Sequence, residues 1–353
     1  MNTLWPGSCP IITMRSGPMP DNRITPLLQY PATGRRSRFS LPRTLKEDIR
    51  SGRHRLEGIV LHGMFNPIAV RMGAYLKKIG VPYLFIPHDP YVAGILHHSR
   101  LKKLLWWHLF EKRFIENAVA LQLLDESHEE PLRKLGCHVR TFVIPNGCEI
   151  ATASQLSANA RIPGSGNPIR LQFLGRMDRN HKGLDLLLEG FALYLKSPPA
   201  DARPVELFLS GNDWHDRKEL EELASRLGIT GSVVFTGRRD ESSVAIFSEA
   251  DIAILSSRFD GFGLCIIEAM LAGRPVLVSE RAGVATHVRK AGGGWCFPPR
   301  PEAIADAIRT AIGERARWPE IGEANHRYVT GHLSWEQIAR QTAEAYRQIF
   351  SKA

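Results

Sequence analysis

From residue 58 onward, short and almost entirely apolar segments alternate with longer segments in which apolar residues recur at helical spacing. Strand-length segments that are apolar throughout are typical of parallel strands buried on both faces by helices. The pattern therefore favours an α/β protein with doubly wound sheets. The segments that predict strands are Gly58–His62, Pro82–Ile86, Ala118–Leu124, Thr141–Ile144, Ile169–Leu174, Val205–Ser210, Val233–Thr236, Ile252–Leu255 and Pro275–Val278.

The segments between these strands predict amphipathic helices, and the clearest is Gly183–Leu195. Its apolar residues at 184, 187, 188, 191 and 195 follow the spacing of a single buried helix face. Further helices are expected at Pro67–Lys78 and Leu101–Asn117. A last helix begins at the capping-box sequence that opens with Ser334 and runs to about Phe350.

A chain of 353 residues predicts two domains. Residues 151–168 are rich in Ala, Ser, Asn, Gly and Pro without apolar periodicity, which is typical of a linker. We therefore predict one domain over 1–150, a second over 169–333, and a C-terminal helix over 334–353. Residues 1–57 contain seven prolines and predict irregular structure apart from a short strand at Cys9–Met14.

The composition is that of a globular protein, with 43% hydrophobic residues. No window approaches the 18 or so consecutive apolar residues of a transmembrane helix, and no secretory signal is evident near the N-terminus. The five cysteines form no CxxC pair, which suits a reducing compartment and favours neither disulfides nor a zinc site. We therefore expect a cytoplasmic protein.

The formal net charge of +10 indicates anionic partners. Nucleic acid, phospholipid headgroups and phosphorylated ligands all satisfy this condition. No nucleic-acid-binding motif accompanies the charge, so nucleic acid is the least favoured partner.

The first motif follows the strand Ile169–Leu174 and has the sequence Gly175-Arg176-Met-Asp-Arg-Asn-His-Lys182-Gly183. A glycine at a strand end permits a sharp turn and a close ligand approach. Two cations beside the N-terminus of the next helix predict a site for a dianion such as a pyrophosphate. A solvated basic loop is the alternative interpretation.

The second motif follows the strand Ile252–Leu255 and runs from Arg258 through Asp260-Gly261-Phe262-Gly263-Leu264 to Glu268. Its glycines allow backbone N–H groups to face an anion at the next helix N-terminus. Asp260 and Glu268 can then face the same crevice, where ribose hydroxyls are suitable donors to a buried glutamate. The alternative makes Asp260 the helix N-cap and Glu268 a surface charge.

Together these motifs resemble the nucleotide-sugar domain of family-4 retaining glycosyltransferases, which have the GT-B fold. Each motif is weak alone, but the resemblance is specific because six occur in the family's order, and it extends over residues 58–350. The six are Gly175-Arg176…Lys182-Gly183, Leu209-Ser-Gly211, Phe235-Thr-Gly237-Arg238, the Asp260-to-Glu268 segment, Ala272-Gly273-Arg-Pro275-Val and Gly292-Gly-Gly294-Trp.

The resemblance implies two Rossmann-like domains facing across a cleft, and a retaining hexosyltransferase that moves a sugar from a nucleotide diphosphate sugar to a glycan or lipid-linked acceptor. Surface polysaccharide biosynthesis is the implied process. Arg176 and Lys182 would hold the diphosphate and stabilise the leaving nucleotide in place of a metal ion, so no cofactor is expected. Glu268 would bind the ribose hydroxyls, and Asp260 would contact the transferred sugar. His88 would lie across the cleft near the sugar and the acceptor.

The remaining implied contacts come from the donor-binding loops. Gly237 and Arg238 would border the nucleobase. The other implied donor-binding residues are Gly175, Gly183, Gly211, Gly261, Phe262, Gly263 and Leu264.

The chain departs from the family pattern in two places. It has Asp260 where the family usually has glutamate, and residues 1–57 lack the expected strand, Gly-rich turn and helix. The second departure predicts an N-terminal domain that is incomplete or that starts late relative to the family, with an exposed sheet edge.

Histidines outside the motifs allow two interpretations. A lone histidine after a strand is often structural, and the family context is what favours His88 as a site residue. His62, His97 and His98 have no such support and are interpreted as background.

The segment from Arg100 to Arg113 interleaves Lys102, Lys103, Lys112 and Arg113 with Trp106 and Trp107. It predicts an interfacial helix at the inner face of a membrane, with one cationic and one aromatic face. A basic wall of the acceptor cleft and an ordinary amphipathic helix with core tryptophans are the alternatives.

Other functions remain open at this stage. A non-catalytic or truncated nucleotide-sugar-binding protein would explain the unusual N-terminus, and a nucleotide-sugar epimerase would share the fold. A dinucleotide oxidoreductase is disfavoured because no G-x-G-x-x-G follows the first strand.

Overall fold

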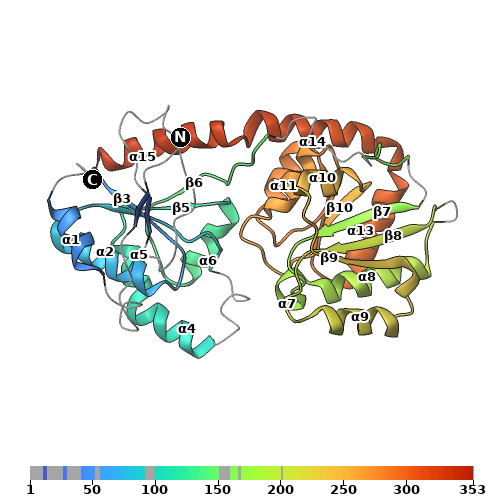
Figure 1. Cartoon of the computed structure of the whole chain (residues 1–353), viewed down its shortest axis with the longest axis horizontal. Coiled ribbons are helices and arrows are strands. Elements are labelled where there is room, and N and C mark those ends of the chain that lie inside the picture. The colour runs from blue at the N-terminus through green and yellow to red at the C-terminus, as the bar shows by residue number, and fades with distance from the viewer. Residues whose placement is uncertain are drawn as a thin grey trace. The chain divides into compact units, whose positions relative to one another are not determined.

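The computed structural model describes residues 41–51, 56–91, 100–150, 160–165, 168–199 and 202–352, together with two short strands nearer the N-terminus (Figure 1). The chain divides into two compact units. Unit 1 comprises Met1–Pro145 with Glu336–Ala353, and unit 2 comprises Asn146–Trp335. The sequence predicts a boundary after residue 150 and a separate terminal helix, whereas the structure divides the chain after Pro145 and assigns that helix to unit 1.

Unit 2 contains a six-stranded parallel sheet in the order β12-β11-β10-β7-β8-β9. The order runs outward in both directions from β7 and β10, which is the doubly wound arrangement. The predicted α/β class is therefore confirmed, although β12 was not among the expected strands. The bounds are β7 Ile169–Leu174, β8 Val205–Ser210, β9 Val233–Gly237, β10 Ile252–Leu255, β11 Val276–Ser279 and β12 Gly294–Phe297.

Helices cover both faces of this sheet, with α8 and α9 on one side and α10 and α11 on the other (Figure 1). The helix predicted at Gly183–Leu195 is α8, and its apolar face is buried apart from Leu195, which is partly exposed. The bounds are α7 Arg179–Lys182, α8 Leu184–Lys196, α9 Arg217–Arg226, α10 Ser243–Ser248, α11 Leu264–Leu271, α12 Ala285–Ala291, α13 Pro301–Gly313 and α14 Trp318–His332, with 3-10 turns η5 Thr230–Ser232 and η6 Arg315–Arg317.

Unit 1 contains a four-stranded parallel sheet in the order β3-β4-β5-β6, and the order of these described strands never reverses. Its main core lies between this sheet and the helices α1, α2, α5 and α6. The bounds are β3 Ile59–His62, β4 Tyr83–Ile86, β5 Ala120–Leu123, β6 Thr141–Val143, α1 Arg43–Arg50, α2 Pro67–Ile79 and α6 Glu129–Lys134, with the 3-10 turn η3 Glu126–His128.

The expectation that residues 1–57 are irregular is wrong for one segment. Arg43–Arg50 form α1, which buries Leu45 and Ile49 in the core of unit 1. Within the expected strand Cys9–Met14, Ile11–Thr13 form β1, which pairs in parallel with β2, Leu27–Gln29.

The predicted helix Leu101–Asn117 consists of α4, Arg100–Trp106, a π-helical turn η2, Trp107–Glu111, and α5, Lys112–Glu116. The aromatic face expected for Trp106 and Trp107 is wrong, because Trp107 is only 1% exposed and packs in the core of unit 1. The exposed apolar side chains of α4 and η2 are Leu101, Leu105, Leu109 and Phe110.

The last helix, α15 (Trp335–Phe350), covers the second face of the unit 1 sheet. Ile349 packs there on Leu84 and Ala120. The Tyr346 hydroxyl donates a 2.6 Å hydrogen bond to Oε1 of the buried Gln122 in β5. The C-terminal segment therefore completes the N-terminal unit.

Candidate active site

Two loops meet at the carboxyl edge of the unit 2 sheet, one after β7 and one after β10. These strands are direct neighbours, with Ile252 opposite Leu171. The strand order reverses between them, and ligands of doubly wound folds bind in the crevice at such a switch point. Both motifs found in the sequence lie in these two loops.

The loop after β7 requires glycine at its end for a steric reason. Gly183 has φ of +63°, and a Cβ there would lie 2.4 Å from the carbonyl oxygen of Ser256. Asp178 begins the loop's short helix α7 by accepting a 2.8 Å hydrogen bond from the backbone N–H of His181. The backbone at Gly183 therefore packs directly against the end of β10.

The neighbouring strand ends approach just as closely. Gly211, after β8, has φ of +141°, and a Cβ there would lie 1.8 Å from the carbonyl oxygen of Gly175. The Gly211 N–H also donates a 2.8 Å hydrogen bond to the carbonyl of Gly237. The glycines expected to bind donor thus bring the ends of β7, β8 and β9 together.

The two loops are joined by an ion pair. Nζ of Lys182 lies 2.6 Å from Oδ2 of Asp260, and these side chains are only 14% and 10% exposed. The Ser257 hydroxyl donates to the same carboxylate oxygen at 3.3 Å. Lys182, predicted to bind the diphosphate, and Asp260, predicted to bind the sugar, are therefore in direct contact.

The N-cap interpretation of Asp260 is wrong. The N-cap of α11 is Gly263, with φ of +83° and no side-chain cap. The Asp260 carboxylate instead accepts a 3.3 Å hydrogen bond from the backbone N–H of Phe262. Because the first N–H groups of a helix have no intrahelical partner, those of Leu264 and its neighbours remain suited to an anion.

The Arg176 side chain lies on an aromatic ring. Its guanidinium lies 4.9 Å from the ring centroid of Trp214, which is 52% exposed, and 3.5 Å from Nδ1 of His181. Loss of solvent contact and the positive charge of Lys182 lower the pKa of His181, although Asp260 opposes this. Neither Trp214 nor His181 was a candidate site residue: Trp214 lies outside the family motifs, and His181 lies within the first motif at a position to which the resemblance assigns no role.

Glu268 is half-buried on α11, so the interpretation as an ordinary surface charge is wrong. Burial raises the pKa of its carboxyl, and a hydrogen bond from the side chain of Ser243, at the start of α10, lowers it. Both Glu268 and Asp260 also act on the pKa of the Cys265 thiol, which loss of solvent contact raises to about 12. The two motif carboxylates thus flank the same residue of α11.

Arg258 has a structural role that the motifs did not reveal. Its guanidinium makes two hydrogen bonds to the Asp185 carboxylate, at 2.7 and 2.8 Å, and a third to the carbonyl of Arg179 at 2.8 Å. These bonds fix the loop after β10 to α7 and α8. At the edge of the site, Arg238 is exposed and pairs with Asp240 at 3.4 Å.

The predicted site residue of unit 1, His88, lies in the loop after β4. Its Nε2 is 2.9 Å from Nδ1 of His62, the last residue of β3. His62 was interpreted as background, although its position at the end of a neighbouring predicted strand was a usable signal. His97 and His98 lie outside the described residues.

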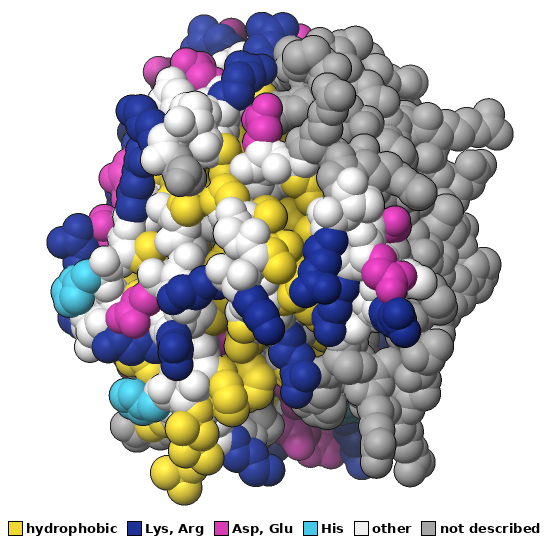
Figure 2. All heavy atoms as spheres, turned by 90° about the vertical axis from the view of Figure 1, so that its left-hand side faces the viewer, with side chains coloured by type: hydrophobic (Ala, Val, Ile, Leu, Met, Phe, Trp, Pro, Cys, Tyr) yellow, Lys and Arg dark blue, Asp and Glu magenta, His cyan; other side chains and the backbone are white. Residues whose placement is uncertain are grey.

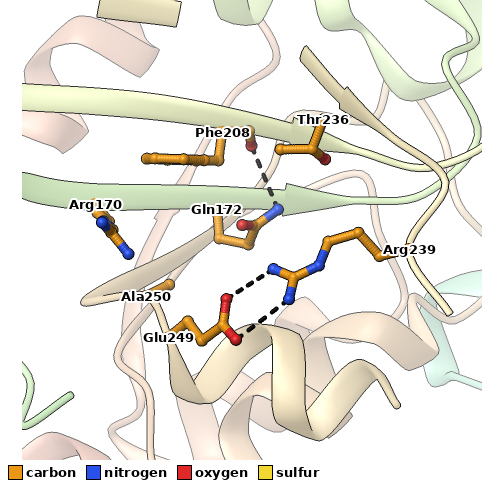
Figure 3. A pocket seen from close by; sticks show the side chains of 7 residues that line it. All are labelled: Arg170, Gln172, Phe208, Thr236, Arg239, Glu249 and Ala250. Atoms are coloured by element: carbon orange, nitrogen blue, oxygen red, sulfur yellow. Dashed lines mark hydrogen bonds and ion pairs between the residues drawn. The ribbon is translucent and has the colours of Figure 1, made fainter. Parts of the chain in front are cut away.

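A cavity of about 300 Å³ in unit 2 is lined by no residue of the two site loops, although Thr236 of the third motif lies on its wall (Figure 3). The cavity and Glu268 are at opposite ends of α10. Glu249, which follows the C-terminal end of this helix, lines the cavity, whereas Ser243, the first residue of the helix, lies beside Glu268. Arg239 and Glu249 pair across the cavity at 2.7 Å. The lining residues are Arg170, Gln172, Phe208, Thr236, Arg239, Glu249 and Ala250.

Two features are absent from the described ranges. No three His, Cys, Asp or Glu side chains there lie close enough together to hold a metal ion. No described helix has both the length and the apolar character needed to cross a membrane.

A family model described as glycosyl transferases group 1 matches residues 168–314. Unit 2 belongs to the glycosyl transferases group 1 family. The match spans both site loops, from β7 to the end of α13.

Curated relatives of the chain include two D-inositol 3-phosphate glycosyltransferases. That of Geodermatophilus obscurus is 30% identical over 236 residues, which is 64% of this chain and 50% of the relative. That of Corynebacterium urealyticum is 31% identical over 183 residues, which is 50% of this chain and 42% of the relative. The chain thus spans about half the length of the curated relatives it matches.

Solved structures establish the GT-B fold of the chain. Sucrose-phosphate synthase from Thermosynechococcus elongatus has a TM-score of 0.72 and 22% identity, covering 98% of this chain and 89% of that one. Anabaena HepE in complex with UDP-glucose has a TM-score of 0.67 and 19% identity, covering 92% and 86%. The predicted fold class is therefore confirmed.

Proposed function

We propose that this protein is a retaining glycosyltransferase that moves a sugar from a nucleotide diphosphate sugar to a glycan or lipid-linked acceptor. The Lys182–Asp260 ion pair at the switch point carries the proposal. It places a desolvated cation and a carboxylate beside a helix N-terminus, so one crevice offers ligands to both a phosphate and a sugar. The family match over the same two loops and the UDP-glucose complex of HepE support the choice of donor.

Each half of the donor has its own ligands in this proposal. Arg176 and Lys182 bind the diphosphate together with the backbone N–H groups from Gly261 to Leu264. Asp260 accepts hydrogen bonds from hydroxyls of the transferred sugar, and Glu268 accepts them from the ribose. Glu268 is suited to this because hydroxyl donors stabilise a carboxylate that burial disfavours.

The chemistry requires the leaving diphosphate to gain negative charge as the glycosidic bond breaks. Lys182 and Arg176 stabilise that charge without a metal ion, and the leaving phosphate accepts the proton of an acceptor that attacks from the same face. Catalysis then rests on positioning and charge stabilisation. Full activity in excess EDTA is the expected result, and activity that returns only on adding Mg²⁺ or Mn²⁺ would overturn the metal-independent mechanism.

The test of the activity needs no acceptor. A panel of nucleotide sugars, beginning with UDP-glucose, is screened for thermal stabilisation and for slow release of the nucleotide. One donor should be hydrolysed by the parent protein, and Arg176→Ala should reduce the rate by about 10²–10³, as loss of one charge-stabilising donor does elsewhere. Glu268→Ala should abolish donor binding.

A matched control separates a specific loss from a general one. Arg179 lies in the same loop, but its side chain pairs at the surface with Glu219 at 2.8 Å. Arg179→Ala should therefore hydrolyse the donor as the parent does. Binding without hydrolysis would favour a non-catalytic nucleotide-sugar-binding protein, and sugar interconversion without nucleotide release would favour an epimerase. No binding of any donor would exclude the transferase, the non-catalytic binding protein and the epimerase alike.

We further propose that unit 1 docks on an anionic membrane surface, as enzymes of surface polysaccharide synthesis with lipid-linked acceptors must. Leu101, Leu105 and Leu109 recur every four residues and are 83%, 60% and 57% exposed. Hydrophobic side chains project at the lower end of the unit 1 surface, where α4 lies, and Lys and Arg side chains spread across the face above them (Figure 2). Exposed leucines beside cations are typical of helices that insert into a membrane interface.

Vesicle sedimentation tests this surface. The parent should bind phosphatidylglycerol vesicles, bind phosphatidylcholine vesicles weakly, and dissociate as salt screens the cations. Leu105→Ser with Leu109→Ser should weaken binding at least about tenfold, because each buried leucine contributes about 1.5–3 kcal/mol. Ile162→Ser, which removes a side chain 69% exposed in unit 2, is the control. Equal binding by all three proteins would exclude α4 as the docking surface.

A further inference from the structure

A pair of histidines lies at the carboxyl edge of the unit 1 sheet. His62 ends β3 and His88 follows β4, its neighbour in the sheet. Nδ1 of His62 is 2.9 Å from Nε2 of His88, and the two ring planes are 18° apart. This nitrogen separation is that of a hydrogen bond, so one ring donates N–H to the other.

Near neutral pH each ring of the pair carries one proton, and one of these two protons lies in the hydrogen bond between the rings. Loss of solvent contact and the nearby His88 lower the pKa of His62 to about 4, although part of this residue stays exposed. Loss of solvent contact also lowers the pKa of His88, and the negative charge of Asp89 opposes this. Both rings are therefore neutral, and Nδ1 of His88 is its ring nitrogen outside the pair.

The backbone of His88 is held in an unfavourable conformation. Its φ is +70°, in the left-handed region that non-glycine residues seldom adopt. Such conformations persist where the surroundings enforce them, and they concentrate at functional sites.

The surroundings that enforce it centre on Glu111, which is 1% exposed. Its Oε1 accepts hydrogen bonds from the Phe65 backbone N–H at 2.8 Å and from the Tyr91 hydroxyl at 2.9 Å. Phe65 lies in the loop after β3, and Tyr91 in the loop that carries His88. One buried carboxylate thus fixes both loops that bring the histidines together.

We infer that His62 is a positioning residue that fixes the ring orientation and tautomer of His88, so that Nδ1 of His88 is held ready to hydrogen-bond a substrate hydroxyl. The inference rests on the proposed function, because His88 has a substrate only in a transferase. No net proton leaves the pair: its hydrogen bond selects which nitrogen of His88 carries the proton.

Two variants of His62 test this inference on the full-length protein. The side-chain amide of asparagine can place a hydrogen-bonding atom where Nδ1 of histidine lies, whereas leucine of similar size has none. His62→Leu should lower kcat of the identified donor reaction about tenfold, because His88 remains but loses the partner that positions it. The donor KM should stay within about twofold of the parent value. His62→Asn should restore most of kcat. In a His88→Ala background, His62→Leu should have no further effect.

Nuclear magnetic resonance of nitrogen-labelled histidine supplies a readout that needs no activity. In the parent, the chemical shifts of the two ring nitrogens of His88 should indicate one tautomer. In His62→Leu they should indicate a mixture of tautomers, and the His88 ring should titrate at a higher pH. Unchanged His88 nitrogen shifts in His62→Leu would overturn the inference, as would equal kcat for the Leu and Asn variants. A parent that hydrolyses no donor but shows these shifts would refute the proposed function and leave the histidine pair standing.

Discussion

At the scale of single residues, the site contains charges that stabilise each other before any ligand arrives. Lys182 and Asp260 are both largely removed from water, and each would carry an uncompensated charge without the other. In the proposed reaction, a diphosphate would therefore take over the cation that Asp260 now holds. This exchange would link donor binding to the release of Asp260 for its contact with the sugar.

Replacing Lys182 by methionine should lower the free energy of unfolding by about 1–3 kcal/mol, because the Asp260 carboxylate loses its charged partner. Asp260→Asn added to this variant should restore part of the stability without restoring donor hydrolysis. Urea denaturation measures the first effect and nucleotide release the second. Lys196→Met, at an exposed position on α8, is the control and should change neither.

Glu268 should make stability depend on pH in an unusual direction. Because burial raises the pKa of its carboxyl in the folded protein, the folded state holds this proton to a higher pH than the unfolded state. Its contribution to stability therefore falls as pH rises from about 4.5 through the folded pKa. Glu268→Gln should melt at a higher temperature than the parent at pH 7 and at the same temperature near pH 4. A lower melting temperature at pH 7 would contradict this.

At the scale of elements, the π-helical turn η2 explains how unit 1 holds its loops. A π turn adds a residue to a helical turn, and such turns are often found at functional sites. Here η2 buries both Trp107 and Glu111. Oε2 of Glu111 accepts a 2.8 Å hydrogen bond from Nε1 of Trp106, in addition to the two bonds from the neighbouring loops.

Glu111→Gln should destabilise the protein by about 1–3 kcal/mol, because the amide N–H₂ would face a donor and leave it unsatisfied. The loops after β3 and β4 should then exchange their amide hydrogens faster, which hydrogen-exchange mass spectrometry can follow. Glu116→Gln, in α5, removes only a 3.7 Å surface ion pair with Lys112 and should be almost neutral. Equal effects of the two substitutions would show that Glu111 does not fix the loops.

Which elements the sequence could predict depends on whether their cause is local. The strands of unit 2 and helix α8 follow from apolar patterns within each segment, and the glycines follow from turn geometry. The π turn is not predictable in this way, because its cause is the burial of Glu111 against loops distant in sequence. α1 was missed because the prolines around it outweighed the helical spacing of Leu45 and Ile49.

The candidate site shows the same division. The motif order located Lys182 and Asp260 on neighbouring loops and Glu268 on the helix that follows, because parallel strands bring their carboxyl ends to one edge. The same rule applied to His62 and His88 was sufficient to suggest their pairing. Side-chain partners such as Arg258 and Asp185 required the three-dimensional structure, since many acids could have served.

At the scale of the whole molecule, the contact between α15 and unit 1 is sterically tight. A Cβ on Gly58 would lie 2.1 Å from Cε1 of Phe350. Gly58→Ala should therefore destabilise the protein by about 1–3 kcal/mol, as overpacking does. Gly331→Ala in α14, where a Cβ would meet nothing within 4 Å, should be neutral or slightly stabilising. Denaturant unfolding of both variants tests the contact, and equal stability would contradict it.

The position of α15 also bears on how the chain is made. Leu84 and Ala120 are synthesised before unit 2, whereas the helix that covers them is synthesised after it. Domains generally fold in the order of their synthesis, but here unit 2 can finish while one face of the unit 1 sheet is still uncovered. Until α15 has been synthesised, that apolar face is a suitable substrate for chaperones, so unit 1 matures after unit 2.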